Sequence, residues 1–374
     1  MPRNVDPVSQ SQTMDRFIAA GIEAVAKFGI DNVSVQYISE LAKGSRPTFY
    51  TYFGDINGLL AEIWIGRSQQ WLELVSNPMG NHSTWTKKEK VLHSALSEIL
   101  AASHRIPEIN EVVQLSMQTW WKSLAKQSDL EKLKIFWLIA ERLGVSLTEP
   151  VDSQVHQAEF IEQGIIGLTD EIASKPTTAL VLPKLSDPSF QDESLESKLL
   201  QSAIYIIANS GVKAASMARI ARRTQVSTGA LYPRFSNTQD IVEKSFELAI
   251  SQIVNQNFAL VNGGNFTADD FGAIVMAGLQ ESRQTWRNFR IEIHLGAKER
   301  PSLSARMKRN LQETNAFVAS GLKPIKRQEL AQGPVPYLMH AVGIGFAVLQ
   351  NAGLPVAKYD HRIVTVGLTK LLNA

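Results

Sequence analysis

The 374-residue chain contains no cysteine. Disulfides, thiolate metal sites and cysteine nucleophiles are therefore excluded, and this composition fits a cytoplasmic protein. The chain also lacks a long apolar run, because the longest, Val335–Leu349, includes a proline and is shorter than the roughly 20 residues of a membrane helix. The first twelve residues are polar and have no apolar core of the signal-peptide type. We expect a cytoplasmic protein with no membrane partner.

The net charge is small, and the sequence has no recognisable catalytic motif. The formal charge is only +2, but a small basic surface can be diluted by a large neutral domain. The seven histidines are scattered without metal-ligand spacing, and the sequence has no phosphate-binding loop and no nucleophile elbow. We predict no enzymatic activity, no catalytic or metal-binding residues and no cofactor.

The sequence does contain an internal repeat. Residues 14–60 and 196–242 align without a gap at an offset of 182. Within the 25 positions from Gly29 to Phe53, six pairs are identical: Gly29/Gly211, Ser34/Ser216, Ile38/Ile220, Ser45/Ser227, Tyr50/Tyr232 and Phe53/Phe235. Such identities at turns and caps exceed chance and indicate a duplicated unit.

Each copy is predicted to form three short helices. Apolar residues at helical spacing begin the unit, and Gly29 or Gly211 follows where a left-handed cap favours glycine. Ser34 and Ser216 are N-cap candidates for the second helix, and Ser45 and Ser227 for the third. Two short helices joined by about four residues after a support helix form a helix-turn-helix, whose last helix enters the DNA major groove.

The segments from Ile38 to Phe53, ISELAKGSRPTFYTYF, and from Ile220 to Phe235, IARRTQVSTGALYPRF, resemble the DNA-binding domain of the TetR family of bacterial transcriptional repressors. The resemblance covers about 47 residues in each copy. It implies an all-α fold of two TetR-like units, each with a three-helix DNA-binding domain followed by a helical ligand-binding and dimerisation domain.

The resemblance also implies a set of DNA-binding residues. In the first copy these are Ser34, Lys43, Ser45, Arg46, Pro47, Thr48, Tyr50, Thr51 and Tyr52. In the second copy they are Ser216, Gln225, Ser227, Thr228, Gly229, Ala230, Tyr232 and Arg234, with Pro233 also on the groove face. The two tyrosines would donate their hydroxyls to backbone phosphates.

Two departures from the family pattern stand out. The turn carries Lys43 and Gln225 where the family has glycine, so we expect either a different turn geometry or an additional DNA contact there. A lysine that the family places three residues after the last aromatic is replaced by Ile56 and Thr238.

The two heads differ in charge and in reading surface. Four basic residues oppose five acidic ones over 14–58, a net charge of −1, whereas six oppose two over 196–240, a net charge of +4. Arg46 can pair with guanine, while the second surface, Thr228-Gly-Ala, is small. We therefore expect an asymmetric operator, held more strongly by the second head at high salt.

The remainder of each half is predicted to be helical. The expected helices are Val91–Ser103, Glu111–Lys126, Leu130–Leu143, Gln154–Ile172, Asp269–Glu281, Ser302–Ser320, Tyr337–Asn351 and Lys358–Leu371. The expected order is a flexible arm 1–12, a first DNA-binding domain 13–58, a first regulatory domain 59–180, a linker 181–195, a second DNA-binding domain 196–240 and a second regulatory domain 241–374.

Partners follow from this organisation. The resemblance implies dimerisation through the last helices, so we expect an intramolecular pseudo-dimer, with Gly343 and Gly345 allowing close packing and with further homodimerisation left open. Trp120, Trp121 and Trp137 are candidate pocket residues for a small lipophilic effector, or else core residues. The expected function is a ligand-released repressor on double-stranded operator DNA. The alternatives are a ligand-independent DNA binder and a chain in which one head only packs.

Overall fold

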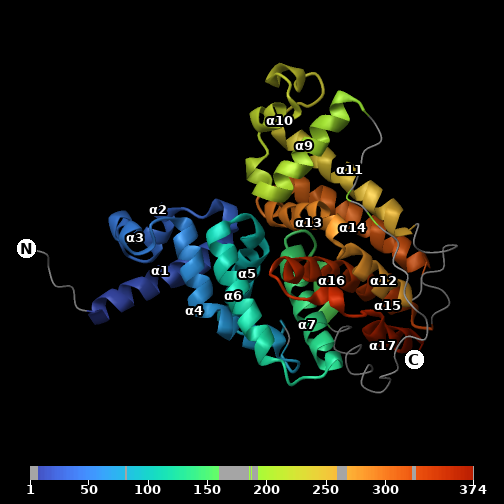
Figure 1. Cartoon of the computed structure of the whole chain (residues 1–374), viewed down its shortest axis with the longest axis horizontal. Coiled ribbons are helices and arrows are strands. Elements are labelled where there is room, and N and C mark those ends of the chain that lie inside the picture. Colours follow the sequence, from blue (N-terminus) through green and yellow to red (C-terminus); the bar gives the residue numbers. More distant parts are fainter. Residues whose placement is uncertain are drawn as a thin grey trace, which may run out of the picture. The chain divides into compact units, whose positions relative to one another are not determined.

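The computed structural model describes residues 7–80, 82–159, 185, 187, 193–258, 268–321 and 326–373. Every regular element in these ranges is an α-helix or a 3-10 helix, so the expected all-α class is confirmed. The chain divides into two compact units, Met1–Lys122 and Ser123–Ala374 (Figure 1).

The first unit contains the first head and three further long helices. Its elements are α1 (Pro7–Phe28), η1 (Ile30–Asn32), α2 (Val35–Leu41), α3 (Arg46–Phe53), α4 (Ile56–Ser76), α5 (Lys87–Ala102), η2 (Ser103–Arg105) and α6 (Pro107–Ser123). The rings of Phe17, Phe49 and Phe53 meet in the head's core with centroids 5.3 to 5.9 Å apart. Helix α5 packs against α1, and the buried Glu98 carboxylate accepts the Ile30 backbone N–H at 2.8 Å. This contact fixes the turn that follows α1.

The second unit contains one helix of the first half and the whole described second half. Its elements are α7 (Asp129–Thr148), η3 (Ser153–Gln157), α9 (Leu195–Ser210), η4 (Val212–Ala214), α10 (Met217–Thr224), η5 (Thr228–Ala230), α11 (Thr238–Phe258), α12 (Ala268–Gly278), η7 (Glu281–Arg283), α13 (Gln284–Ala297), α14 (Pro301–Gly321), α15 (Gln328–Gln332), α16 (Pro334–Asn351), η8 (Val356–Lys358) and α17 (Arg362–Asn373). Buried Leu199, Ile220, Phe235 and Phe289 belong to one apolar cluster that joins the second head to α13. Helix α13 packs on α9 as α5 packs on α1.

The two heads share an unusual backbone feature. Gly29 and Gly211 have φ values of 78° and 83° and ψ values of 154° and 162°. Positive φ was expected here, but these angles lie outside the left-handed helical region, in a region that only glycine adopts freely. The duplication therefore extends from sequence to local conformation.

Helices α7 and α16 pack at backbone contact distance. A Cβ built on Gly144 would lie 1.8 Å from the Ala341 carbonyl oxygen, and one on Gly345 would lie 1.8 Å from the Ala140 carbonyl oxygen. Each helix thus offers an alanine and a glycine four residues apart to the other. The expected role of Gly345 in close packing is confirmed, whereas Gly343 lies against Arg290 instead.

Six of the eight expected helices overlap α5, α6, α7, α12, α14 and α16. The other two expected helices differ from the structure. The segment expected at 154–172 begins as the 3-10 helix η3, and its part from residue 160 onward lies outside the described residues. The last helix begins at Arg362 rather than Lys358, because Val356–Lys358 forms a 3-10 turn. Helices α4, α11, α13 and α15 were not among the helices expected from the sequence.

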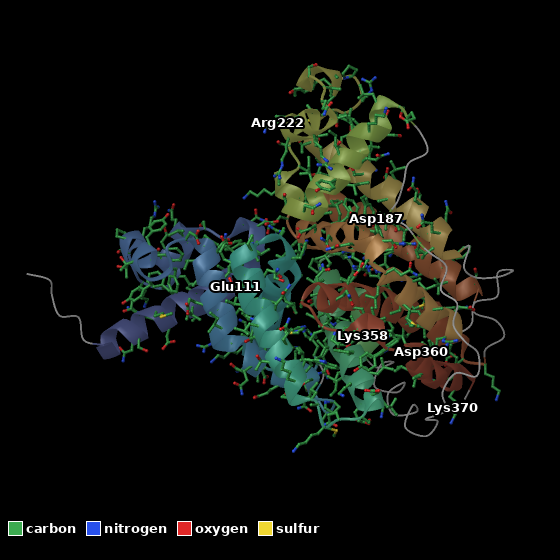
Figure 2. All side chains as sticks on the ribbon, viewed as in Figure 1. Glu111, Asp187, Arg222, Lys358, Asp360 and Lys370 are labelled. Atoms are coloured by element: carbon green, nitrogen blue, oxygen red, sulfur yellow. The ribbon has the colours of Figure 1, made fainter. Side chains whose placement is uncertain are left out.

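Two domain boundaries also differ from expectation. Helix α1 begins at Pro7, so residues 7–12 of the expected arm are helical. The compact units meet after Lys122 rather than at the expected linker 181–195, because α7 packs against α16. Asp187, expected in that linker, accepts the backbone N–H groups of Thr285 and Trp286 at 3.2 and 2.8 Å and so caps the start of α13 (Figure 2).

Candidate nucleic-acid interface and cavity

In the first head, two serines begin the two helices of the helix-turn-helix. Ser34 Oγ accepts the Tyr37 backbone N–H at 3.2 Å, and Ser45 Oγ accepts the Thr48 backbone N–H at 3.2 Å. Both serines are exposed. The expected N-caps of α2 and α3 are confirmed, and their hydroxyls lie at the protein surface, where they can reach a phosphate.

The outward face of α3 carries the predicted reading residues. Arg46, Pro47, Tyr50 and Thr51 are exposed, while Thr48 and Tyr52 are half-buried. Tyr50 is 53% exposed, so its ring is not a core residue. Pro47 lies in the first turn, where a missing N–H costs little. The Thr51 hydroxyl donates to the Pro47 carbonyl at 2.9 Å, which keeps it close to the helix.

The turns of the two heads keep the conformation that glycine favours. Lys43 and Gln225 have φ values of 51° and 61°. The expectation that a side chain here would need a different turn geometry is therefore wrong. Both residues are exposed, so the additional DNA contact is still a prediction for their side chains.

The second head departs from the predicted third helix. Thr228–Ala230 forms a single 3-10 turn, followed by hydrogen-bonded turns through Arg234, and Ser227 makes no side-chain cap. Gly229 weakens a helix at this point, and Pro233 lacks the N–H needed to extend one. Ser216 does cap α10, by accepting the Arg219 backbone N–H at 3.3 Å. The prediction of a full second recognition helix is wrong.

Predicted side chains of the second head nevertheless reach the surface. Tyr232 is 63% exposed, Ser216, Gln225, Ser227 and Gly229 are exposed, and Thr228 and Ala230 are half-buried. Arg234 is half-buried and donates to the Ala230 carbonyl at 2.8 Å. Arg234 thus braces the 3-10 turn in this structure.

Three arginines of α10 supply half of the six basic residues of the second head. Arg219 donates to the Ser210 hydroxyl at 2.8 Å, and the guanidinium of Arg223 lies 3.3 Å from the centre of the Tyr205 ring. Arg222 is exposed on the same helix (Figure 2). Two of these side chains are therefore held on the surface of the head, and Arg222 extends from it.

The second unit contains a cavity of about 190 Å³. Most of its lining is apolar and comes from α11, α12, α13, α14 and α16, with Phe246, Phe271 and Phe289 among the larger side chains. Its tryptophan is Trp286, whereas Trp120, Trp121 and Trp137 are not among its lining residues.

The three tryptophans predicted as pocket residues lie elsewhere. Trp120 and Trp121 are half-buried on α6. Trp137 is buried in α7, and its ring lies 5.7 and 5.5 Å from those of Phe271 and Phe346, which do line the cavity. Trp137 thus packs against two side chains of the cavity wall without lining the cavity itself. A pocket role for Trp120 and Trp121 stays a prediction.

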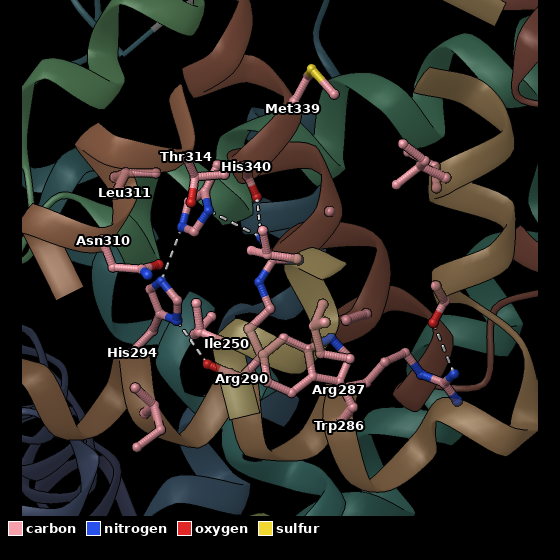
Figure 3. A pocket seen from close by; sticks show the side chains of 18 of the residues that line it. Ile250, Trp286, Arg287, Arg290, His294, Asn310, Leu311, Thr314, Met339 and His340 are labelled. Atoms are coloured by element: carbon pink, nitrogen blue, oxygen red, sulfur yellow. Dashed lines mark hydrogen bonds between the residues drawn. The ribbon is translucent and has the colours of Figure 1, made fainter. Parts of the chain in front are cut away.

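Four residues of basic type, at the end of η7 and along α13, line this apolar cavity. Arg283, Arg287, Arg290 and His294 all line it, at successive spacings of four, three and four residues (Figure 3). Burial lowers the pKa of Arg283 and of Arg290 to about 10 and that of His294 to about 3. Sequence reasoning missed this group, although the basic residues recur at helical spacing within an apolar stretch, a signal that could have located it.

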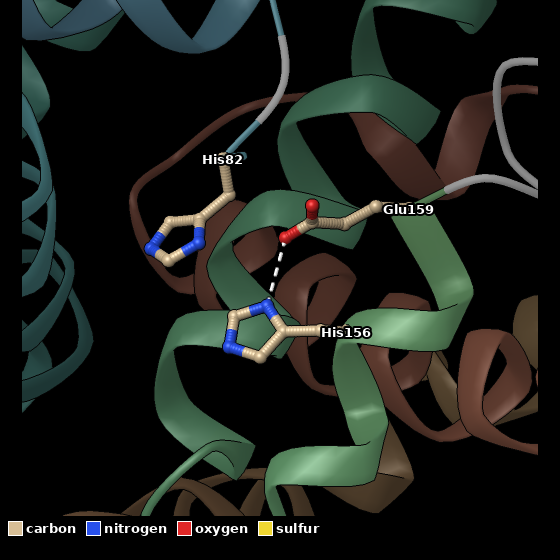
Figure 4. Close-up of side chains that lie close together, drawn as sticks. All are labelled: His82, His156 and Glu159. Atoms are coloured by element: carbon tan, nitrogen blue, oxygen red, sulfur yellow. Dashed lines mark hydrogen bonds and ion pairs between the residues drawn. The ribbon is translucent and has the colours of Figure 1, made fainter. Parts of the chain in front are cut away.

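A separate histidine of the second unit is paired with acids. His156 Nε2 lies 3.3 Å from Glu149. Its Nδ1 lies 3.0 Å from Glu159 (Figure 4). The hydrogen bonds with Glu149 and Glu159 raise the pKa of His156 to about 9 despite partial burial. His156 is therefore a cation at neutral pH.

Comparison with known proteins agrees with the geometry of the heads. The family described as bacterial regulatory proteins, tetR family, matches the chain twice, at residues 17–63 and 199–244. No curated protein matches the chain. Among the described residues, no helix has the length and apolarity needed to cross a membrane.

Proposed function

Because the chain carries the helix-turn-helix domain of the tetR family of bacterial regulatory proteins twice, we propose that it is a repressor that binds one operator with both heads. The observation that carries this proposal is the pair of outward surfaces, each with an exposed tyrosine at the same repeat position, Tyr50 and Tyr232. Hydroxyls at such positions can donate to backbone phosphates and fix the register of a head on the duplex.

The two reading surfaces support an asymmetric operator. The first offers the α-helix α3 with exposed Arg46, and the second a 3-10 turn with exposed Gly229. An arginine can pair with guanine, whereas a small turn permits close backbone approach. Unlike surfaces require unlike half-sites.

The contact between α7 and α16 supports an intramolecular pseudo-dimer. One helix comes from each half of the sequence, and the paired contacts Gly144–Ala341 and Ala140–Gly345 are reciprocal, as in an isologous dimer interface. A single chain would then present two heads to DNA, as a dimer of single-headed chains does.

The cavity supports release by a small molecule. Two heads that enter successive major grooves must be about 34–36 Å apart. A ligand that binds more tightly to a conformation with another spacing lowers DNA affinity by its differential affinity for the two states. This argument favours a ligand-responsive repressor over a ligand-independent one.

Selection of bound sites from a random DNA pool tests the proposal. The intact chain should select one asymmetric site, and Tyr50→Ala and Tyr232→Ala should each weaken a different half of it. Tyr50→Phe and Tyr232→Phe serve as matched controls that remove only the hydroxyl.

A second candidate function is a repressor in which the second head only packs. The 3-10 turn in place of a recognition helix favours it. A single short selected motif, unaffected by Tyr232→Ala, would establish this alternative and contradict reading by both heads. Equal affinity for a perfect palindrome of either half would contradict the asymmetry.

A further inference from the structure

The cavity of the second unit is apolar along most of its wall, but three arginines at the end of η7 and on α13 also line it. Arg283, Arg287 and Arg290 line it, and none of its lining residues is an aspartate or glutamate. Residues spaced by three positions share one face of a helix, so Arg287 and Arg290 lie on the same face of α13, and Arg283 lies four residues earlier, just before the helix. A cavity for a purely apolar ligand does not need three arginines.

Two of these arginines already have an acid nearby. Asp187, which caps α13, raises the pKa of Arg283 and of Arg287 against the larger lowering effect of burial, and Glu281 does the same for Arg287. Arg287 also donates to the carbonyl groups of Gly278, at 3.2 Å, and Gln280. The charges of these two guanidinium groups are therefore partly compensated within the protein, although Nε of both residues and Nη2 of Arg283 have no hydrogen-bond partner among the described residues.

Arg290 has neutral partners. Its Nη2 donates to His340 Nδ1 at 3.2 Å and to the His340 carbonyl at 2.9 Å. Burial alone lowers its pKa, with no opposing acid. In the described part of the chain this charge therefore has no counter-ion. A buried cation is costly unless an anion or a full set of hydrogen bonds compensates it, so a bound anion would stabilise Arg290.

The histidines beside Arg290 cannot act as that counter-ion. Because His340 Nδ1 accepts from Arg290, its Nε2–H donates to His294 Nε2 at 3.1 Å, and His294 Nδ1–H donates to the Arg290 carbonyl at 2.7 Å (Figure 3). Burial lowers the pKa of both rings, so both are neutral. They hold Arg290 in place and leave its charge facing the cavity.

We propose that this cavity binds an amphipathic carboxylic acid, with its apolar body among Phe246, Ile250 and Phe271 and its carboxylate on Arg290. Both hydrogen bonds to His340 use Nη2, so Nη1 can donate a charge-assisted hydrogen bond to the carboxylate. This assignment adds an acid group to the small lipophilic effector expected from the sequence. It rests on the proposed function for its regulatory meaning, although the binding itself is measured without DNA.

Binding by the intact chain to two pairs of compounds tests the assignment. The pairs are decanoate with 1-decanol and 4-phenylbutanoate with 4-phenyl-1-butanol, titrated by calorimetry. At least one acid should bind tenfold or more tightly than its alcohol. Arg290→Gln should weaken that acid at least tenfold and change its alcohol less than twofold.

Three further variants serve as controls. Arg309→Gln removes an exposed arginine of α14 outside the cavity lining and should leave both affinities unchanged. Ile250→Trp fills the cavity and should abolish binding of acid and alcohol alike. Arg290→Lys keeps the positive charge and should retain part of the preference for the acid. It tests the assignment if Arg290→Gln does not fold.

Equal binding of acid and alcohol, binding of neither acid, or an acid affinity unaffected by Arg290→Gln would overturn the inference. Release of selected operator DNA is measured separately. An acid that binds through Arg290 without releasing DNA contradicts the proposed ligand-controlled function alone. Release by an alcohol with no preference for its acid contradicts the carboxylate site alone.

Discussion

Lys43 and Gln225 hold a conformation that ordinary side chains avoid. Both are at positive φ, at equivalent positions in the turns of the two heads. A residue with a Cβ in the left-handed region is disfavoured by roughly 1–2 kcal/mol relative to its preferred regions. Retention of a lysine and a glutamine at this cost, on an exposed turn, is the pattern expected if their side chains contribute to DNA binding.

Replacing either residue by glycine should stabilise the fold. Lys43→Gly and Gln225→Gly should each raise the free energy of unfolding by about 0.5–1 kcal/mol, because relief of the positive φ exceeds the entropy cost of glycine. Denaturant unfolding measures the change. Lys43→Ala and Gln225→Ala keep a Cβ and should show no such gain; alanine variants as stable as the glycine variants would contradict the strain argument.

His156 gives a pH-dependent contribution to stability. Its pKa is raised from 6.5 to about 9 by Glu149 and Glu159, so the folded state binds this proton more tightly than the unfolded state. The contribution is complete below pH 6.5 and is lost as the pH rises through about 9. The stability difference between wild type and His156→Gln should therefore shrink between pH 6 and pH 10. A difference that is constant over this range would show that the pair stabilises the fold without ionisation.

At the scale of elements, the contact between two helices determines which residues are allowed at its closest points, whatever their helix propensity. The close contact of α7 and α16 requires glycine at two positions, since any side chain on Gly144 or Gly345 meets the backbone of the facing helix. Close packing of small residues lets the two backbones approach and brings dispersion contacts along both helices. This contact also carries the proposed pseudo-dimer.

Gly144→Ala and Gly345→Ala should each destabilise the second unit by about 1–3 kcal/mol, the usual range for overpacking. Gly66→Ala in α4 is the matched control, because a Cβ there meets nothing within 4 Å and alanine favours a helix. Thermal unfolding measures all three. A loss for Gly66→Ala as large as for Gly345→Ala would show that helix contact is not the cause.

At the scale of the whole molecule, the two heads share one fold but differ in charge. The net charge is −1 over residues 14–58 and +4 over 196–240. Phosphate neutralisation supplies most non-specific affinity for DNA, so the second head should supply most of the salt-sensitive binding. The first head, with Arg46 on a complete helix, should supply more of the base reading.

Arg222→Gln should make the plot of log binding constant against log salt concentration less steep. The negative slope should decrease in magnitude by about 0.9, the value for one phosphate contact. The comparison is Arg309→Gln, which removes the same charge from α14 and should leave the slope unchanged. Operator binding by fluorescence anisotropy between 50 and 200 mM salt measures both. Equal slopes for wild type and Arg222→Gln would place this arginine outside the DNA contact.

The sequence alone determined the duplication, the all-α class and the local signals of each head. Serine caps, the glycines after α1 and α9 and the turn spacing act over a few residues, so their effect is readable in the chain. It could not determine the single 3-10 turn of the second head, where a serine at the cap position is outweighed by Gly229 and Pro233.

Tertiary structure decided the rest. The cavity is assembled from side chains of five helices within residues 238–351, and only their packing shows that Arg287 and Arg290 line it while Trp137 lies against two of its lining phenylalanines. The crossing of α7 with α16 likewise depends on which surfaces meet, which helical periodicity does not specify. Burial, which lowers the pKa of Arg290 and keeps the neighbouring His294 neutral, is a property of the packed chain alone.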